Sequence, residues 1–158
     1  MITNFNMRAY LERAKQNKEY MSTGNNISRI VDILWPDFVY INECIFIKES
    51  YNKSHVQESE FVDKTSYEAF VNHIHLDQIY WGEPVDYYEV LQIALKVLDM
   101  WKIKLKNDCP NMKFILILSF NEEDCNLRFH RFRQNELPWI NPDEIQKFEE
   151  GIMIVETN

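Results

Sequence analysis

The most restrictive feature of the sequence is an apolar run in its C-terminal third. Residues 113–120 read KFILILSF, and only Lys113 and Ser119 in this run are polar. Side chains in a strand point alternately to the two faces of a sheet. A continuous apolar run of this length is therefore typical of a strand with cover on both faces. The run predicts a central strand buried between two layers.

Three other stretches predict strands in the same domain. Residues 121–126 (NEEDCN) are typical of a turn, and residues 127–133 (LRFHRFR) return the chain as the second strand of a hairpin. Residues 38–49 (FVYINECIFIKE) are rich in β-branched and aromatic side chains, which favour a strand. Residues 152–156 (IMIVE) predict a last short strand.

The remaining chain predicts helices and one polar loop. The spacing of Thr65 and Glu68, and that of Asp86 and Glu89, matches a capping box at a helix start. An amphipathic apolar stripe follows Glu89 and ends before Pro110. Helices are predicted over residues 6–20, 27–34, 65–75, 90–106 and 142–150, and a loop over residues 50–62. The sequence therefore predicts one α+β domain, with a mostly antiparallel sheet of about four strands packed with about five helices.

Length and composition agree with a single globular domain. The chain has 158 residues, of which 46% are hydrophobic, which suits one domain and is too apolar for disorder. No apolar run approaches the length that spans a bilayer, and the start of the chain lacks the apolar stretch of a signal peptide. The three cysteines are far apart and odd in number, which is typical of reduced thiols. We therefore expect a cytoplasmic protein.

The negative charge is concentrated in one segment. The net charge is −8, and residues 54–95 carry eight acids and one base, a net charge of −7. The rest of the chain, with 17 acids and 16 bases, has a net charge of −1. Such asymmetry bears on partners, not on fold. It disfavours nucleic acid and anionic membranes as partners of this segment, and it favours a cation, a basic ligand or a basic protein.

Residues 77–89 (DQIYWGEPVDYYE) combine this charge with large aromatic side chains. Helix capping accounts for Asp86 and Glu89, but not for the aromatic cluster or for the missing bases. Aromatic residues carry much of the energy at protein interfaces, and surrounding carboxylates steer a basic partner. The alternative interpretation is a solvated acidic helix start. The candidate partner-binding residues are Tyr80, Trp81, Glu83, Asp86, Tyr87 and Tyr88, with Glu58 and Glu60 as a rim.

Known catalytic and metal-binding motifs are absent from the sequence. It contains no glycine-rich phosphate loop, no GxSxG and no HExxH. His73 and His75 would point apart on a helix but could share a metal on a strand. Residues 121–125 (NEEDC) offer carboxylates, although a solvated hairpin tip explains them more simply. We therefore predict no catalytic residues, no metal and no cofactor. The alternative is a metal-dependent enzyme that uses His73, His75, His130 and nearby carboxylates.

Residues 127–133 interleave basic and aromatic side chains, a pattern that can stack on single-stranded nucleic acid. A strand with one packed face and one charged face explains the same pattern. The arginines would then pair with acids of the same chain. The acidic balance of the protein favours this second interpretation, so we predict no nucleic-acid partner.

The C-terminal third, KFILILSFNEEDCNLRFHRFRQNELPWINPDEIQKFEEGIMIVE, resembles bacterial immunity proteins. These are the small cytosolic inhibitors of polymorphic toxins and contact-dependent growth inhibition toxins. The resembling elements are an apolar strand, an acidic turn, an Arg/Phe strand, a loop with Trp139, a short acidic helix and a last strand. The resemblance implies a compact acidic protein without catalytic machinery that binds a toxin domain, often a basic nuclease. It makes no prediction of oligomeric state.

Overall fold

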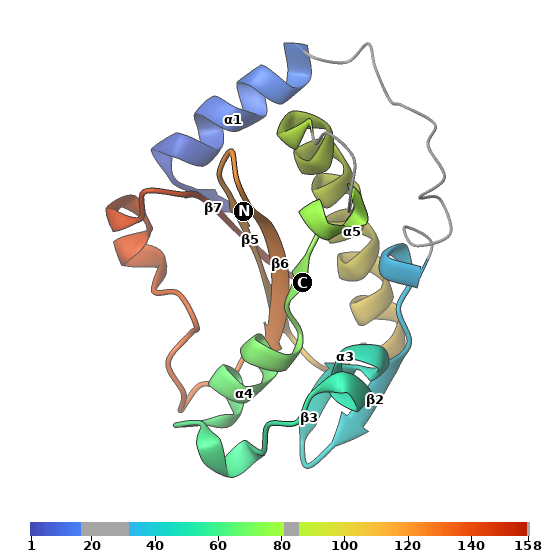
Figure 1. Ribbon diagram of the computed structural model, residues 1–158. Coiled ribbons are helices and arrows are strands. Elements are labelled where there is room, and N and C mark those ends of the chain that lie inside the picture. The colour runs from blue at the N-terminus through green and yellow to red at the C-terminus, as the bar shows by residue number, and fades with distance from the viewer. Residues whose placement is uncertain (17–31, 81–85, 158) are drawn as a thin grey trace.

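The computed structural model describes residues 1–16, 32–80 and 86–157 (Figure 1). The start of the helix predicted from residue 27, and the candidate residues Trp81 and Glu83, lie outside the described residues. The side chain of Tyr80 also lies outside them. Within the described chain, no helix is both long and apolar enough to cross a membrane.

The protein is a single α+β domain built on an antiparallel sheet. Five strands pair in the order β1-β7-β5-β6-β4, and every pairing among them is antiparallel. The prediction of a mostly antiparallel α+β sheet is confirmed, although the sheet has one strand more than expected. Its strands are β1 (Ile2–Thr3), β4 (Ile74–His75), β5 (Phe114–Phe120), β6 (Cys125–Arg131) and β7 (Gly151–Glu156).

Strand β5 lies at the centre of the sheet with all seven residues buried, as its apolar run predicts. Leu116 and Leu118 join the larger core, which packs under helix α5 (Tyr87–Asp108). Ile115 and Ile117 face the other way, into a smaller core closed by the 3-10 helix η3 (Pro142–Lys147). Figure 1 shows α5 on one side of the sheet and the segment that carries η3 on the other. Both faces of the sheet are therefore covered.

Helix α5 begins where the sequence predicts. The Asp86 carboxylate accepts hydrogen bonds from the backbone N–H groups of Tyr88 (2.9 Å) and Glu89 (3.4 Å). These N–H groups have no partner within the helix, so the carboxylate satisfies them and also interacts favourably with the helix dipole. Helix α1 (Phe5–Gln16) packs beside α5 and against β7.

We expect the Asp86→Ala variant to lower the free energy of unfolding by about 1 kcal/mol, because it removes this cap. Chemical denaturation measures the change. Asp86→Asn is the matched control, since an asparagine side chain caps a helix about as well as aspartate. Equal losses in both variants would show that the charge, and not the cap, carries the effect.

The prediction of a single strand over residues 38–49 is wrong. The chain there forms a separate hairpin of β2 (Phe38–Ile41) and β3 (Cys44–Ile47). The turn residues Asn42 and Glu43 both have positive φ, 49° and 67°, as two-residue hairpin turns require. Asparagine tolerates this conformation, but glutamate rarely adopts it, so the turn was hard to recognise.

Three other predicted features differ from the structure. The loop predicted over residues 50–62 contains α3 (Lys48–Lys53) and the 3-10 helix η1 (Glu58–Glu60). The helix predicted from Thr65 is α4 (Lys64–Val71), and Asp63 with Ser66 forms its capping box in place of Thr65 with Glu68. The helix ends before His73, so the predicted extension to residue 75 is wrong. The helix predicted at residues 142–150 is the 3-10 helix η3.

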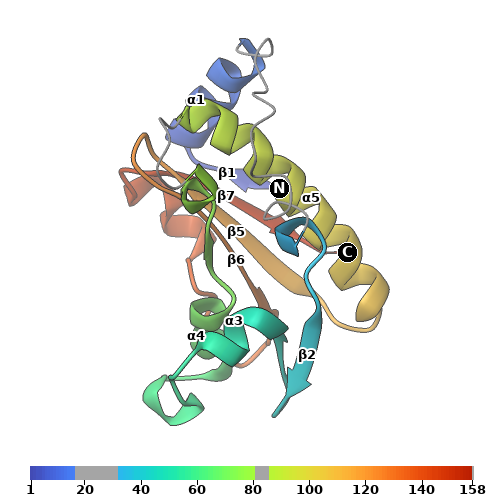
Figure 2. The same ribbon diagram turned by 45° about the vertical axis from the view of Figure 1, so that its right-hand side comes forward.

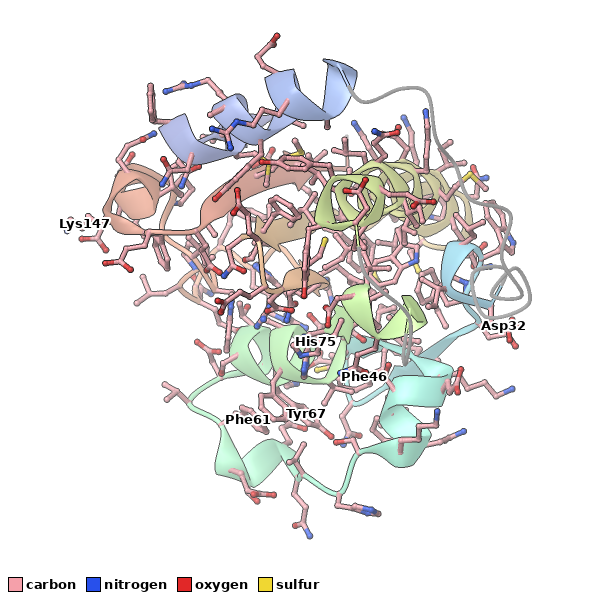
Figure 3. All side chains as sticks on the ribbon, turned by 45° about the horizontal axis from the view of Figure 1, so that its top comes forward. Asp32, Phe46, Phe61, Tyr67, His75 and Lys147 are labelled. Carbon is pink, nitrogen blue, oxygen red and sulfur yellow. The ribbon has the colours of Figure 1, made fainter. Side chains whose placement is uncertain are left out.

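Helix α4 attaches the β2–β3 hairpin to the main sheet. The Glu68 carboxylate accepts the N–H of Ile45 (2.7 Å), and the Asn72 amide bonds both Ile47 N–H and Ile45 C=O at 2.8 Å. These two side chains therefore satisfy the buried edge of β3, where a further strand would otherwise be needed. Figure 3 shows Phe46 and Phe61 close to Tyr67 of α4. Their ring centroids lie 4.9 and 5.1 Å from that of Tyr67.

Candidate functional site

The structure separates the predicted rim from the other candidate residues. Glu58 and Glu60 lie on η1, at the lower end of the molecule in Figures 1 and 2, whereas Asp86 lies at the upper end, where α5 begins. The Glu60 carboxylate also accepts the N–H of Gln57 at 2.6 Å, so it serves a local cap. Glu58 and Glu60 therefore do not border a surface centred on Asp86.

Tyr87 and Tyr88 are partly buried. The Tyr88 ring packs against Tyr10 and Phe120, with centroids 6.5 and 6.2 Å away. Its hydroxyl accepts a hydrogen bond from Arg13 (2.9 Å) and donates one to Glu122 (3.3 Å). Tyr87 packs against the larger core. Both tyrosines therefore pack against neighbouring side chains near Asp86, and part of each residue stays accessible to solvent.

The hydrogen bond from Tyr88 to Glu122 brings a second acidic segment to this surface. Glu122, Glu123 and Asp124 form the turn between β5 and β6, the segment that the sequence favours as a solvated hairpin tip. Asp77 lies beside this turn, because its carboxylate accepts the N–H of Cys125 at 3.4 Å. Five carboxylates from three chain segments therefore gather at one end of the molecule. We call this set the acidic end: Asp77, Asp86, Glu122, Glu123 and Asp124.

Few bases balance the acidic end. Among the described residues, the bases within ion-pair distance of its carboxylates are Arg13, 3.6 Å from Glu122, and His75, 2.9 Å from Asp124. Arg13 and Glu122 are both more than 60% exposed, so this pair contributes little to stability. The surface is therefore available to an external cation or basic group.

His75, Asp77 and Asp124 form a compact set of potential ligands within the acidic end. One donor atom from each lies within 4.8 Å of the others. His75 belongs to strand β4, whereas His73 lies just before it, so the two histidines do not share the strand on which the sequence would let them share a metal. The ring of His73 lies near that of His75, with centroids 5.3 Å apart. No local sequence pattern could show that these three residues lie together, because Asp124 is 49 positions after His75 in the chain.

His130 does not join these histidines. Strand β4 pairs with β6 so that His75 lies opposite Asn126, and His130 lies four residues further along β6, about 13 Å away. Its side chain is also 1% exposed. The predicted alternative of a metal-dependent enzyme using all three histidines therefore lacks the geometry it needs.

Burial lowers the pKa of the His130 imidazole below its ordinary value of 6.5, and its Nε2 has no hydrogen-bond partner among the described residues. In the unfolded chain this histidine takes up a proton near pH 6.5. The folded state resists that proton until the pH falls further, so acid favours unfolding. The contribution of His130 to stability is complete above pH 6.5 and is lost as the pH falls through the folded-state pKa.

We therefore expect the free energy of unfolding to fall between pH 7.5 and 5.5, with a contribution from His130 of at most about 1.4 kcal/mol per pH unit. Denaturation at several pH values measures this slope. The His130→Leu variant should show a flatter dependence in the same window, since carboxylate contributions are common to both proteins. Identical slopes would contradict the assignment.

The Arg/Phe strand is largely committed to internal contacts. The Phe129 ring lies in the larger core, and the Arg133 guanidinium pairs with buried Glu68 at 2.8 Å. The Arg128 guanidinium stacks over Trp139 at 5.0 Å. One interpretation of the sequence is that these arginines pair with acids of the same chain. Arg133 forms such a pair with Glu68. These contacts leave no regular alternation of accessible basic and aromatic side chains along the described strand.

The fold and the acidic end define an α+β domain whose distinctive surface is anionic. The chain belongs to the Uncharacterized protein PM0498 family, whose model matches residues 2–158. It matches no curated protein and no solved structure.

Proposed function

We propose that this protein is an immunity-type inhibitor that binds a basic, nuclease-like toxin domain through its acidic end. The observation that carries the proposal is the convergence of five carboxylates from three chain segments on one end of the domain, with only Arg13 and His75 within ion-pair distance of them among the described residues. The resemblance of the C-terminal third to immunity proteins supports the same function.

Electrostatics explain how such a surface would select its partner. A nuclease domain carries cations where it binds the phosphates of its substrate, and carboxylates can occupy those positions in their place. Complementary charge raises the association rate and penalises partners of like charge. The accessible parts of Tyr87 and Tyr88 would add contact area next to the carboxylates, as aromatic side chains do at interfaces.

The proposal places the protein in the cytoplasm and gives it no catalytic role of its own. All three cysteines are free. Burial raises the pKa of the Cys44 thiol to about 12 and also raises that of Cys125, so both stay protonated at neutral pH. A protonated, buried thiol is a poor nucleophile. These residues therefore act as ordinary core side chains.

Co-expression tests the proposal. The domain encoded immediately upstream of this gene is expressed in a sensitive host, alone and together with the protein, and the protein is then recovered by an affinity tag. We expect the domain to stop growth when expressed alone, and the protein to restore growth and to retain the domain on the column. A harmless domain, or a toxic one that the protein neither neutralises nor binds, would contradict the proposal.

A further inference from the structure

We propose that His75, Asp77 and Asp124 bind one divalent first-row transition-metal ion. Their donor atoms lie within 4.8 Å of one another, and His75 Nδ1 is 2.9 Å from Asp124 Oδ1. Ligands that share an ion with bonds of about 2.1 Å are separated by at most about 4.2 Å. Shifts of less than about 1 Å, inward for the widest pair and slightly apart for His75 and Asp124, therefore bring all three donors into bonding distance.

The chemistry of the donors defines the class of ion. One imidazole nitrogen with two carboxylate oxygens suits ions such as Zn²⁺ and Mn²⁺, whereas Ca²⁺ and Mg²⁺ prefer sites made of oxygen alone. Three protein ligands leave at least one coordination position for water or for a group from a partner. A site of this kind is accordingly open at the surface of the domain.

The fold holds the three residues on separate elements that the sheet brings together. The N–H of Leu76, which lies between His75 and Asp77, donates to the carbonyl of Cys125 at 2.8 Å, so β4 and the residue after Asp124 are fixed to each other. The Asp124 N–H donates to Asn121 Oδ1 at 2.7 Å. The positions of the ligands are thus set by backbone pairing that does not depend on an ion.

The charge around the three residues favours a cation. Among the described residues, neither Asp77 nor Asp124 has a lysine or arginine within ion-pair distance. His75 contacts Asp124 directly, and His73 and Arg128 interact with Asp124 at longer range. The side chains of His75 and Asp124 are 35% and 41% exposed, so they are partly desolvated but reachable. His75 also lines a surface cleft of about 930 Å³, which neither Asp77 nor Asp124 lines. A divalent ion would neutralise the excess negative charge.

Calorimetric titration of the purified full-length protein, freed of metal by a chelator, tests the site with Zn²⁺ and Mn²⁺ separately. We expect one ion per chain for at least one of the two metals. His75→Gln and Asp124→Asn should each weaken binding at least tenfold. Glu123→Gln is the comparison variant, because it removes a neighbouring carboxylate that is not in the set, and it should weaken binding by less than about threefold.

Two results would overturn the site. The first is the absence of stoichiometric binding of either metal to the wild-type protein. The second is an equal loss of affinity in Glu123→Gln, which would show diffuse attraction to the acidic end. Asp77→Asn provides a further variant if Asp124→Asn does not fold, since an amide oxygen still accepts the Cys125 N–H. The titration contains no partner protein, so its outcome is separate from that of the co-expression test.

Discussion

Replacing Glu68 by alanine is expected to lower the free energy of unfolding by about 3–5 kcal/mol. The side chain is fully buried, and its carboxylate accepts three hydrogen bonds: from Ile45 N–H (2.7 Å), Arg131 N–H (2.7 Å) and the Arg133 guanidinium (2.8 Å). Its loss leaves the largely buried Arg133 cation and two backbone donors without this partner. The same contacts join α4, the β2–β3 hairpin and β6, so their loss also loosens the hairpin.

Chemical denaturation measures this effect as a shift of the midpoint at constant slope. Glu43→Gln is the control, because Glu43 pairs with Lys64 at an exposed position where an ion pair contributes at most about 1 kcal/mol. A loss below about 1 kcal/mol in Glu68→Ala would contradict the assignment of Glu68 as the anchor of the hairpin.

Replacing Trp101 by alanine is expected to cost about 3–5 kcal/mol of the free energy of unfolding. The side chain is fully buried on α5, and its ring meets Phe129 edge-to-face, with centroids 5.8 Å apart. Its indole N–H also donates to the carbonyl of Ile33 at 2.7 Å, which fixes the segment before β2 to the helix. The variant therefore leaves a large cavity and also an unpaired carbonyl.

The Trp101→Phe variant separates these two effects. It keeps an aromatic ring in the core but loses the N–H donor, so we expect a smaller cost of about 1–3 kcal/mol. Thermal and chemical denaturation followed by circular dichroism measure both variants. Equal losses in the two variants would show that the bond to Ile33, and not the volume of the ring, dominates.

The parts of the fold that the sequence predicted well are those with strong local signals. The apolar run of β5 has the length of a strand covered on both faces, and the stripe after Asp86 has the spacing of a helix face. The shortest strands were not predicted, because they form only by pairing with segments that are distant in the sequence. Strands β1 and β4 have two residues each and are strands only because β7 and β6 lie beside them.

Part of the surface named in the proposal could be picked out from the sequence for the same reason, although its binding of a partner stays a prediction. Local clustering of acids and aromatics identified Asp86, Tyr87 and Tyr88, which the structure places at the acidic end. The turn from Glu122 to Asp124 reaches that end only through the fold, since Tyr88 meets Glu122 across 34 residues. Glu58 and Glu60 share the charge of the segment, but α4 and β4 carry the chain away from them. The net charge of a segment therefore predicts that an acidic surface exists more reliably than it predicts which residues form that surface.

The claim that the acidic end binds a basic partner is tested most directly by two charge reversals. Glu123→Lys changes the exposed turn of the acidic end, and Asp99→Lys makes the same charge change at an exposed position of α5, about 20 Å along the helix from Asp86. The dissociation constant of each variant for the toxin domain is measured by calorimetry. We predict at least tenfold weaker binding for Glu123→Lys and unchanged binding for Asp99→Lys. Equal affinities in the two variants, whether both retained or both lost, would contradict the assignment of this surface.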